Sequence, residues 1–242
     1  MRRHDTAAAA ADHLRIGPWR GDPTIALLSP TPGRPPSPEQ VRRCLDQLRS
    51  EGRSAVLTPA LGASEQTSFR TAGFVERERL HLLGRSVRDL PTLPDHPARL
   101  RRARHRDLAS VLAVDALAFD SFWTFDAAAL RDARLATPRS RFRVAVVDGR
   151  VIGYHVTGAG GRMGYLQRLA VHPDLHGRGI GTALVRDALE WSTRRGCSQV
   201  LVNTQETNDR AYALYRHLGF TDEPTGLAVL SYTFDDARTL TS

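Results

Sequence analysis

The spacing of apolar positions divides much of the chain into recognisable elements. In residues 107–119, Leu108, Val111, Leu112, Asp115 and Phe119 return at three- and four-residue intervals, the spacing of one helix face, so this stretch predicts a helix. The same kind of evidence predicts further helices at 126–135, 181–193 and 209–217 and strands at 141–147, 151–157, 165–171, 199–203 and 227–234.

A tight hairpin and two proline-rich breaks organise these elements. Asp148-Gly149 stands between two strand-like runs, and this dipeptide favours a two-residue antiparallel hairpin turn. Prolines cluster at 30–38 and 91–97, where they oppose helix and sheet. We therefore expect a linker at 91–97.

This linker predicts two parts of the chain, a smaller N-terminal lobe at 1–95 and a main domain at 98–235. The first 15 or so residues, which are rich in alanine and lack a helix cap, are expected to be disordered.

The two parts resemble each other. Residues 41–58 match 184–202 as a helix, a glycine and an apolar strand, and residues 68–74 match 214–220. This alignment places Phe69 opposite Tyr215 and Gly73 opposite Gly219. Either the first half is a shortened copy of the second, or two ordinary helix-strand units are similar by chance.

Composition narrows the classes of function. The net charge is +8, and all 34 basic residues are arginines dispersed along the chain, which fits a polyanionic ligand or an acidic partner and makes nucleic-acid binding unlikely. The first residues do not show the basic-then-apolar pattern of a signal peptide, and no apolar run of about 18 residues occurs, so we expect a cytoplasmic protein without a membrane partner. Cys44 and Cys197 are expected to be half-buried free thiols, and no metal site is expected.

The most informative stretch is a glycine-rich turn. An apolar strand ends at Val171, and Gly177, Gly179 and Gly181 then lead into a helix. Glycines let main-chain N–H groups converge on a ligand, and a helix N-terminus adds unsatisfied donors, so the turn predicts a phosphate site. A nucleotide P-loop is excluded because the chain has no lysine. A Rossmann motif is disfavoured because antiparallel hairpin strands precede the turn.

Two motifs resemble those of the GCN5-related N-acetyltransferase (GNAT) family. LAVHP at 169–173 followed by HGRGIG at 176–181 is similar to the family's strand and glycine turn. Asn208 followed by AYALYRHLGF at 211–220 is similar to its closing signature. The resemblance covers nearly all of 98–235, and it implies an α/β (α+β) fold with a mixed, strongly twisted sheet flanked by helices.

The resemblance also implies a binding mode and a reaction. Strands 165–171 and 199–203 would splay apart around the pantetheine arm of acetyl-CoA, and a strand N–H such as that of Val171 would polarise the thioester carbonyl. Tyr215 matches the family's general acid, which protonates the departing thiolate, unless it only packs its helix. Asn208 either holds pantetheine or caps a helix. The implied coenzyme-binding residues are Leu169, Ala170, Val171, His176, Gly177, Arg178, Gly179, Ile180, Gly181, Thr182, Asn208 and Tyr215.

The chain departs from the family pattern at two places. His176 stands where glutamine or arginine is usual, and Arg178 is a compensating cation or a solvated side chain. Gln167 and Asn203 stand where relatives often carry a glutamate base, so no carboxylate there can deprotonate an ammonium. Asp120, His155 and His172 are weaker candidates for a base, and water-mediated deprotonation is the alternative.

Substrate choice in this family is implied to come mainly from the segment that matches 119–126. Phe122 and Trp123 can wall an acceptor pocket there, or they pack a helix junction. Gln167 and Asn203 are the further substrate-binding candidates. The layout somewhat resembles bacterial ribosomal-protein alanine N-acetyltransferases, although Asn203 replaces their carboxylate.

We therefore expect an enzyme, a monomer or homodimer, that acetylates the primary amine of a peptide N-terminus or a small molecule. The competing hypotheses are a noncatalytic acetyl-CoA sensor and a basic nucleic-acid module. The first half lacks a glycine turn and has Phe69 for the tyrosine, so it would be a GNAT-like lobe that neither grips nor protonates the coenzyme.

Overall fold

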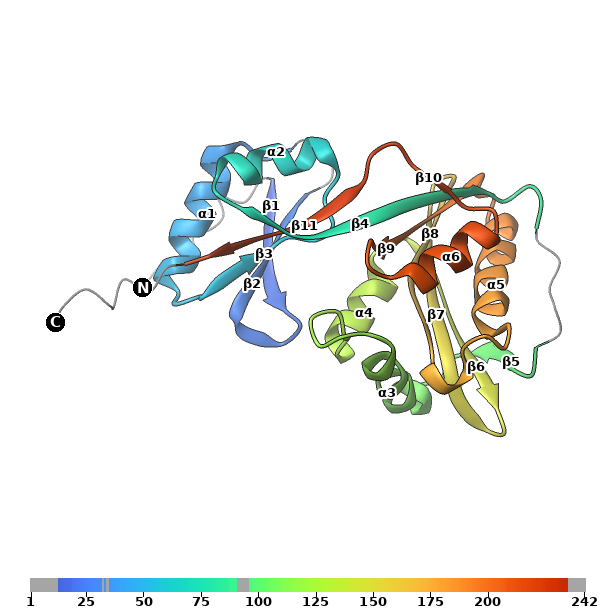
Figure 1. Cartoon of the computed structure of the whole chain (residues 1–242). Helices are drawn as coiled ribbons and strands as arrows, with labels where there is room; N and C mark the ends of the chain where they lie inside the picture. Colours follow the sequence, from blue (N-terminus) through green and yellow to red (C-terminus); the bar gives the residue numbers. More distant parts are fainter. Residues whose placement is uncertain (1–12, 32, 34, 91–95, 235–242) are drawn as a thin grey trace. The chain divides into compact units, whose positions relative to one another are not determined.

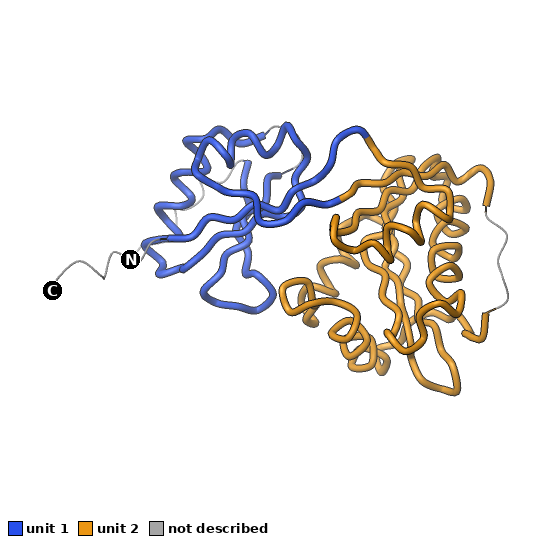
Figure 2. Tube along the Cα trace, viewed as in Figure 1, with its two compact units in different colours: residues 1–80, 224–242 blue, residues 81–223 orange. Residues whose placement is uncertain are grey.

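The structure is a computed structural model, and it describes residues 13–31, 33, 35–90 and 96–234. It contains two compact units, residues 1–80 with 224–242 and residues 81–223 (Figure 2). This division differs from the expected boundary at the proline-rich segment, of which 91–95 lie outside the described residues. The reason is strand pairing, because β4 (Val75–Ser86) continues through the boundary and the chain re-enters the first unit after residue 223.

The first unit is a mixed sheet with two helices. Strand β1 is antiparallel to β2, β2 is parallel to β3, and β11 is antiparallel to both β3 and the first part of β4. The elements are β1 (Leu14–Trp19), β2 (Asp22–Pro30), α1 (Pro38–Ser50), β3 (Ala55–Leu57), α2 (Ala63–Thr71) and β11 (Leu227–Thr233) (Figure 1).

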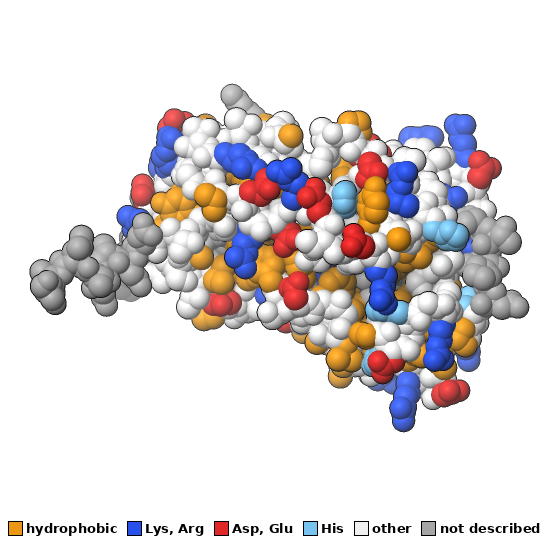
Figure 3. All heavy atoms as spheres, in the orientation of Figure 1, with side chains coloured by type: hydrophobic (Ala, Val, Ile, Leu, Met, Phe, Trp, Pro, Cys, Tyr) orange, Lys and Arg blue, Asp and Glu red, His pale blue; other side chains and the backbone are white. Residues whose placement is uncertain are grey.

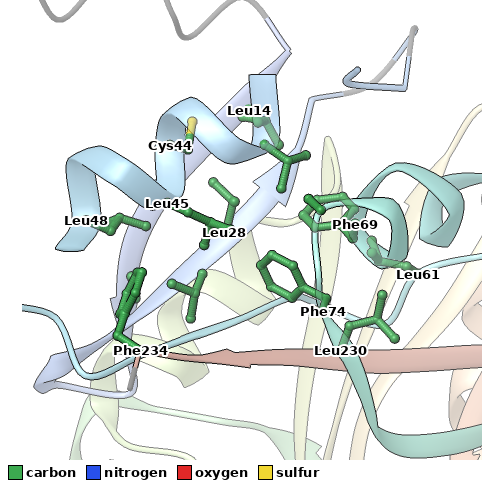
Figure 4. Close-up of a cluster of buried hydrophobic side chains, with 14 of the residues drawn as sticks. Leu14, Leu28, Cys44, Leu45, Leu48, Leu61, Phe69, Phe74, Leu230 and Phe234 are labelled. Carbon is green, nitrogen blue, oxygen red and sulfur yellow. The ribbon is translucent and has the colours of Figure 1, made fainter. Parts of the chain in front are cut away.

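The core of the first unit joins its sheet to both helices. Leu28 from β2, Leu48 from α1 and Phe69 from α2 are fully buried and lie together with Phe74 (Figure 4). The Phe69 and Phe74 rings meet edge to face, with centroids 5.3 Å apart. Of the segment expected to be disordered, residues 1–12 lie outside the described residues, and Leu14 is buried at the start of β1.

The second unit is a longer mixed sheet with two helices on each face. Strands β5 to β8 form an antiparallel meander, β8 pairs with β9 in parallel, and β10 pairs with the second part of β4. The elements are β5 (Arg99–Arg102), a short 3-10 turn at His105–Asp107, α3 (Leu108–Ala118), α4 (Ala127–Leu135), β6 (Arg139–Val147), β7 (Arg150–Gly160), β8 (Met163–Val171), a second 3-10 turn at Pro173–Leu175, α5 (Ile180–Arg194), β9 (Gln199–Gln205), α6 (Asp209–His217) and β10 (Thr221–Asp222).

Alternating side chains of β7 show which helices cover which face. Tyr154 and Val156 pack in the cluster that contains residues of α3 and α4, whereas the intervening His155 reaches α5. Helix α6 lies on the α5 face, because a Cβ built on Gly181 of α5 would be 3.1 Å from Leu214 of α6. The sequence prediction of a mixed sheet flanked by helices is confirmed.

The helices and strands predicted from apolar spacing are confirmed to within a few residues. At the predicted hairpin, Asp148 and Gly149 have φ values of 47° and 77°, the left-handed geometry of a two-residue turn between β6 and β7. Cys44 and Cys197 are free, as expected, and both are buried rather than half-buried. None of the helices described is both long and apolar enough to cross a membrane.

The two matched segments end their helices in the same way. Gly52 and Gly196 both have φ of 77°, and Gly73 and Gly219 have φ of 100° and 81°. Past the second helix of each pair, the N–H of the residue after the glycine bonds back to the matched aromatic position: from Phe74 to Phe69 at 3.1 Å, and from Phe220 to Tyr215 at 3.0 Å. The internal similarity thus extends from sequence to backbone geometry.

Candidate functional site

Strands β8 and β9 are paired over only part of their length and then separate. Their parallel pairing runs from Met163 opposite Gln199 to Leu166 opposite Val202 and goes no further among the described residues. Strand β8 nevertheless stays paired with β7 as far as Val171. A wedge therefore opens between the two strands from Gln167 onward, as the family resemblance implied.

A β-bulge lies at the mouth of this wedge. Val156 of β7 is opposite Arg168 and the next residue, Thr157, is opposite Leu166, so Gln167 is an extra residue in β8. A bulge bends its strand and re-aims the side chains around it. The Gln167 Oε1 atom is buried and has no hydrogen-bond partner among the described residues.

The strand edge facing the wedge carries main-chain groups. The His172 N–H bonds to Ile152 of β7 at 2.8 Å, so Leu169 and Val171, which are out of phase with it, direct their main-chain groups away from β7. This orientation matches the expected hydrogen bonding of pantetheine to Leu169 and Val171.

The glycine turn presents a row of free donors. Gly177 and Gly179 adopt left-handed φ values of 76° and 74°, and α5 begins directly after Gly179 without a side-chain cap. The main-chain N–H groups from Gly177 to Thr182 make no hydrogen bond with any part of the chain that the structure describes. Helix N-termini with such donors bind phosphate groups, so this turn fits the diphosphate of a coenzyme.

His176 makes structural bonds rather than extending toward a ligand. Its Nε2 atom lies 2.9 Å from the carbonyl oxygen of Val171 and donates to it. The Nδ1 atom must then be the acceptor, and it receives a hydrogen bond from Arg210 at the start of α6. The side-chain phosphate contact considered for His176 does not match this arrangement, and the sequence analysis did not identify Arg210.

Tyr215 is placed beside the wedge with an unengaged hydroxyl group. Its side chain packs in one cluster with Leu166 of β8 and Val202 of β9, the last paired residues before the strands part. None of the hydrogen bonds among the described residues involves the phenol oxygen. Burial raises the pKa of Tyr215 above its ordinary value, an effect that the charge of Arg168 partly offsets, so the hydroxyl keeps its proton at neutral pH.

The other coenzyme candidates lie around the same opening. Asn208 caps α6, accepting a hydrogen bond from the Ala211 N–H at 3.0 Å, so its helix-capping alternative is observed. Its side-chain NH₂ group remains a potential donor. Arg178 is exposed in the turn. Ala170 faces the α3 side of the sheet, where it packs with Tyr154.

The three candidate bases each have a local structural role. Asp120 accepts a hydrogen bond from the Trp123 N–H at 3.1 Å, and His172 accepts one from the Asp174 N–H at 3.3 Å. His155 is buried on the α5 face against Asp187 at 3.0 Å, and burial lowers its pKa. Asn203 is exposed on β9. A base for the incoming amine is therefore not defined by these contacts.

A buried ion pair on the α3 face was missed by the sequence analysis. Arg168 of β8 and Asp115 of α3 form two hydrogen bonds of 2.8 Å each, and both side chains are almost completely buried. Tyr154 also donates to Asp115. In sequence the two charges are far apart and unremarkable, and only the helical position of Asp115 among buried apolar residues signals that it faces inward.

The open edge of β8 beside the unbonded N–H groups at the start of α5 fits the class of proteins that bind an extended ligand with a diphosphate. Comparison with known proteins identifies the class more narrowly. Residues 108–220 match the profile of the Acetyltransferase (GNAT) family, and these residues form a GNAT domain. No group of His, Cys, Asp and Glu within the described ranges could hold a metal ion.

The relatives agree with this family. A mycothiol acetyltransferase of Saccharomonospora viridis is 36% identical over 148 residues, which is 54% of this chain and 47% of the relative. The alignment thus spans about half of that protein. A GCN5-related N-acetyltransferase from Sphaerobacter thermophilus has a TM-score of 0.64 at 16% identity, covering 91% of this chain and 76% of the other. A tandem GNAT protein from the clavulanic acid pathway has a TM-score of 0.66 at 16% identity, with coverages of 87% and 75%. These structures show the GNAT fold.

Proposed function

We propose that this chain is an acetyl-CoA-dependent N-acetyltransferase that acts on a primary amine. The observation that carries the proposal is the row of unbonded N–H groups from Gly177 to Thr182 beside the wedge between β8 and β9. A diphosphate at the helix start would direct a thioester arm along the open edge of β8. Membership of residues 108–220 in the GNAT family supports the same reading.

The proposed chemistry is direct attack of a neutral amine on the thioester. The nitrogen forms a bond to the carbonyl carbon, a tetrahedral oxyanion develops, and the nitrogen loses a proton to water. The carbon–sulfur bond then breaks as the carbonyl re-forms. The outward main-chain N–H of Val171 is placed to stabilise the oxyanion. Tyr215, whose hydroxyl keeps its proton because its pKa is raised, would deliver a proton to the departing thiolate.

The acceptor is proposed to be a small-molecule amine or a peptide N-terminus. The name of the Saccharomonospora relative supports the small-molecule class. Phe122 and Trp123 are half-buried in the segment between α3 and α4, where they would line the approach to Gln167. The first unit, whose Phe69 has no phenol, is proposed to be a GNAT-like lobe without catalytic function.

Two measurements test this function. Calorimetry with acetyl-CoA measures binding, and the release of CoA thiol is followed with glycinamide, glucosamine, spermidine and Nα-acetyl-lysine as acceptors. Binding together with amine-dependent thiol release supports the enzyme. Binding without release by any amine favours the noncatalytic sensor, and absence of binding overturns both proposals.

The nucleic-acid alternative receives less support from the surface. On the face shown in Figure 3, arginines and acidic side chains are interspersed, whereas a nucleic-acid groove usually shows a continuous basic stripe.

A further inference from the structure

Arg168 occupies a costly position for a charged residue. It follows the bulge residue Gln167 in β8, and its side chain is 7% exposed. Removing two charges from water costs several kcal/mol per ion, and well-packed apolar residues often serve stability equally well. We therefore ask which part of the fold this ion pair holds in position.

The segment between α3 and α4 is built around this guanidinium. The Arg168 Cζ atom lies 3.4 Å from the centre of the Phe119 ring and 3.9 Å from that of Phe125, so two aromatic rings pack against the cation. Arg168 also donates to the Trp123 carbonyl oxygen at 2.7 Å. Its partner Asp115 accepts from the Phe125 N–H at 2.6 Å.

These contacts join two parts of the proposed site. One end of the network is the strand that presents the open edge to the thioester, at the residue beside the bulge. The other end is the segment that carries Phe122 and Trp123. Arg168 is joined to this segment by the hydrogen bond to the Trp123 carbonyl oxygen and by the contacts with the two aromatic rings. We therefore expect a displacement of β8 at Arg168 to displace the segment as well.

We propose that Arg168 is a positioning residue that fixes the acceptor wall at 119–125 relative to the bulge of β8. This inference rests on the proposed function, because it assumes that this segment lines the acceptor approach. Arginine suits the role because its planar fork can bind a carboxylate with two bonds while stacking on aromatic rings, and lysine can do neither.

The chain provides a matched control on the opposite face of the sheet. Arg141 binds Asp187 with two hydrogen bonds of 2.7 and 2.9 Å, also between the sheet and a helix. Arg141→Lys therefore removes a bidentate ion pair of the same kind without touching 119–125. Comparison of Arg168→Lys with Arg141→Lys distinguishes the effect of losing an ion pair from the effect of displacing the segment 119–125.

The experiment uses the full chain with Trp123 as its single tryptophan, after Trp19→Phe and Trp191→Phe. Acrylamide quenching of Trp123 fluorescence should rise about twofold or more in Arg168→Lys and stay unchanged in Arg141→Lys. If both lysine variants quench like their parent, the proposal is overturned. Should Arg168→Lys not fold, Phe119→Leu keeps the ion pair, removes one ring, and should also raise quenching; unchanged quenching there overturns the proposal.

Kinetics give the second measurement. With the acceptor of the four-amine panel that turns over fastest, Arg168→Lys should raise KM about tenfold, which corresponds to about 1.4 kcal/mol. Its Kd for acetyl-CoA should remain within about twofold of the parent value. An equal rise in the Kd for acetyl-CoA and in the KM of the acceptor would indicate general disorder and overturn the positioning role. If the parent itself fails to bind acetyl-CoA, the proposed function fails, whereas the quenching result still decides whether Arg168 holds the segment.

Discussion

The imidazole of His176 is bonded through Nε2 to the carbonyl oxygen of Val171, 2.9 Å away. His176, which begins the glycine-turn motif at 176–181, is thereby hydrogen-bonded to Val171, the last residue of β8. Because the ring also accepts from Arg210 of α6, a single histidine connects the strand edge, the glycine turn and α6.

Replacement of His176 should weaken coenzyme binding without unfolding the protein. In His176→Ala, Val171 loses its partner and Arg210 its acceptor. We expect acetyl-CoA affinity to fall about 3- to 10-fold, since an intramolecular hydrogen bond contributes about 0.5–1.5 kcal/mol. His176→Gln can still donate to Val171 and should lose less. Calorimetry measures both variants, and an unchanged Kd in His176→Ala would contradict this role.

Removal of the Tyr215 hydroxyl should slow turnover selectively. Tyr215→Phe keeps the ring in its buried cluster and removes the proposed proton donor. We expect kcat to fall about 10²- to 10⁴-fold, the usual range for a general acid, with little change in acetyl-CoA affinity.

Tyr212→Phe on the same helix is the control for this substitution, because its hydroxyl bonds to Asp222 instead. Because the pKa of Tyr215 is raised, the rate should show no alkaline loss from this group up to about pH 10. Equal kcat in Tyr215→Phe and the parent would rule out the proton donor.

Two glycines with the same backbone geometry allow the phosphate turn to be tested. Gly177 has φ of 76° and Gly149 has φ of 77°, and a Cβ at either position would meet no atom within 4 Å. Alanine at each should therefore cost about 1–2 kcal/mol of stability from backbone strain alone. Calorimetry with acetyl-CoA should show weaker binding for Gly177→Ala and normal binding for Gly149→Ala. Equal affinities would show that the turn does not bind the coenzyme.

The ion pair of Arg101 and Asp107 at the start of α3 should make the free energy of unfolding depend on pH. Hydrogen bonds from Arg101 lower the pKa of Asp107 to about 2, with the Arg104 N–H contributing further. A carboxyl with a depressed pKa stabilises the fold above its unfolded pKa near 3.8 and loses that contribution as the pH falls to about 2.

Asp107→Asn should remove this dependence. Urea unfolding between pH 6 and pH 2 should show a smaller decrease in the free energy of unfolding for the variant than for the parent, by about 1–2 kcal/mol. The difference should be confined to the interval below about pH 4, and parallel curves for the two proteins would contradict the assignment.

The main domain should not fold from residue 98 onward. Leu83 and Val87 are buried in the same cluster as Tyr215 and Phe220. A fragment of residues 98–242 lacks both and should show no cooperative thermal unfolding. In the full chain, Leu83→Ala should cost about 2–5 kcal/mol, as large-to-small changes in a core do, and half-buried Leu82→Ala should cost less. A cooperative fragment would contradict this view of the core.

Local signals in the sequence predicted the local structure well. The apolar spacing of α3, the turn at Asp148-Gly149 and the glycines before α5 each depend on neighbouring residues, and each is observed where predicted. The motif around Tyr215 likewise predicted the helix that contains it and its position beside the wedge.

Relationships between distant residues could not be predicted in the same way. Arg168 and Asp115 read as ordinary charges, because the ring contacts and the second hydrogen-bond partners that make their burial tolerable come from a different segment. The boundary of the units was also missed, since β11 pairs with strands about 150 to 180 residues earlier. The side-chain contacts reveal the first fact, and the register of the sheet reveals the second.

Gln167 is an extra residue in β8, so the bulge depends on the number of residues in the strand as well as on their chemistry. Leu166 pairs with Thr157 and Arg168 pairs with Val156, which are neighbouring residues of β7, so deletion of Gln167 would leave both pairings in place. Arg168 would stay on the α3 face, and β8 would become a regular strand without the local bend of the bulge. Amino-acid replacements at Gln167 keep the number of residues in β8, whereas loss of its codon would remove the bulge.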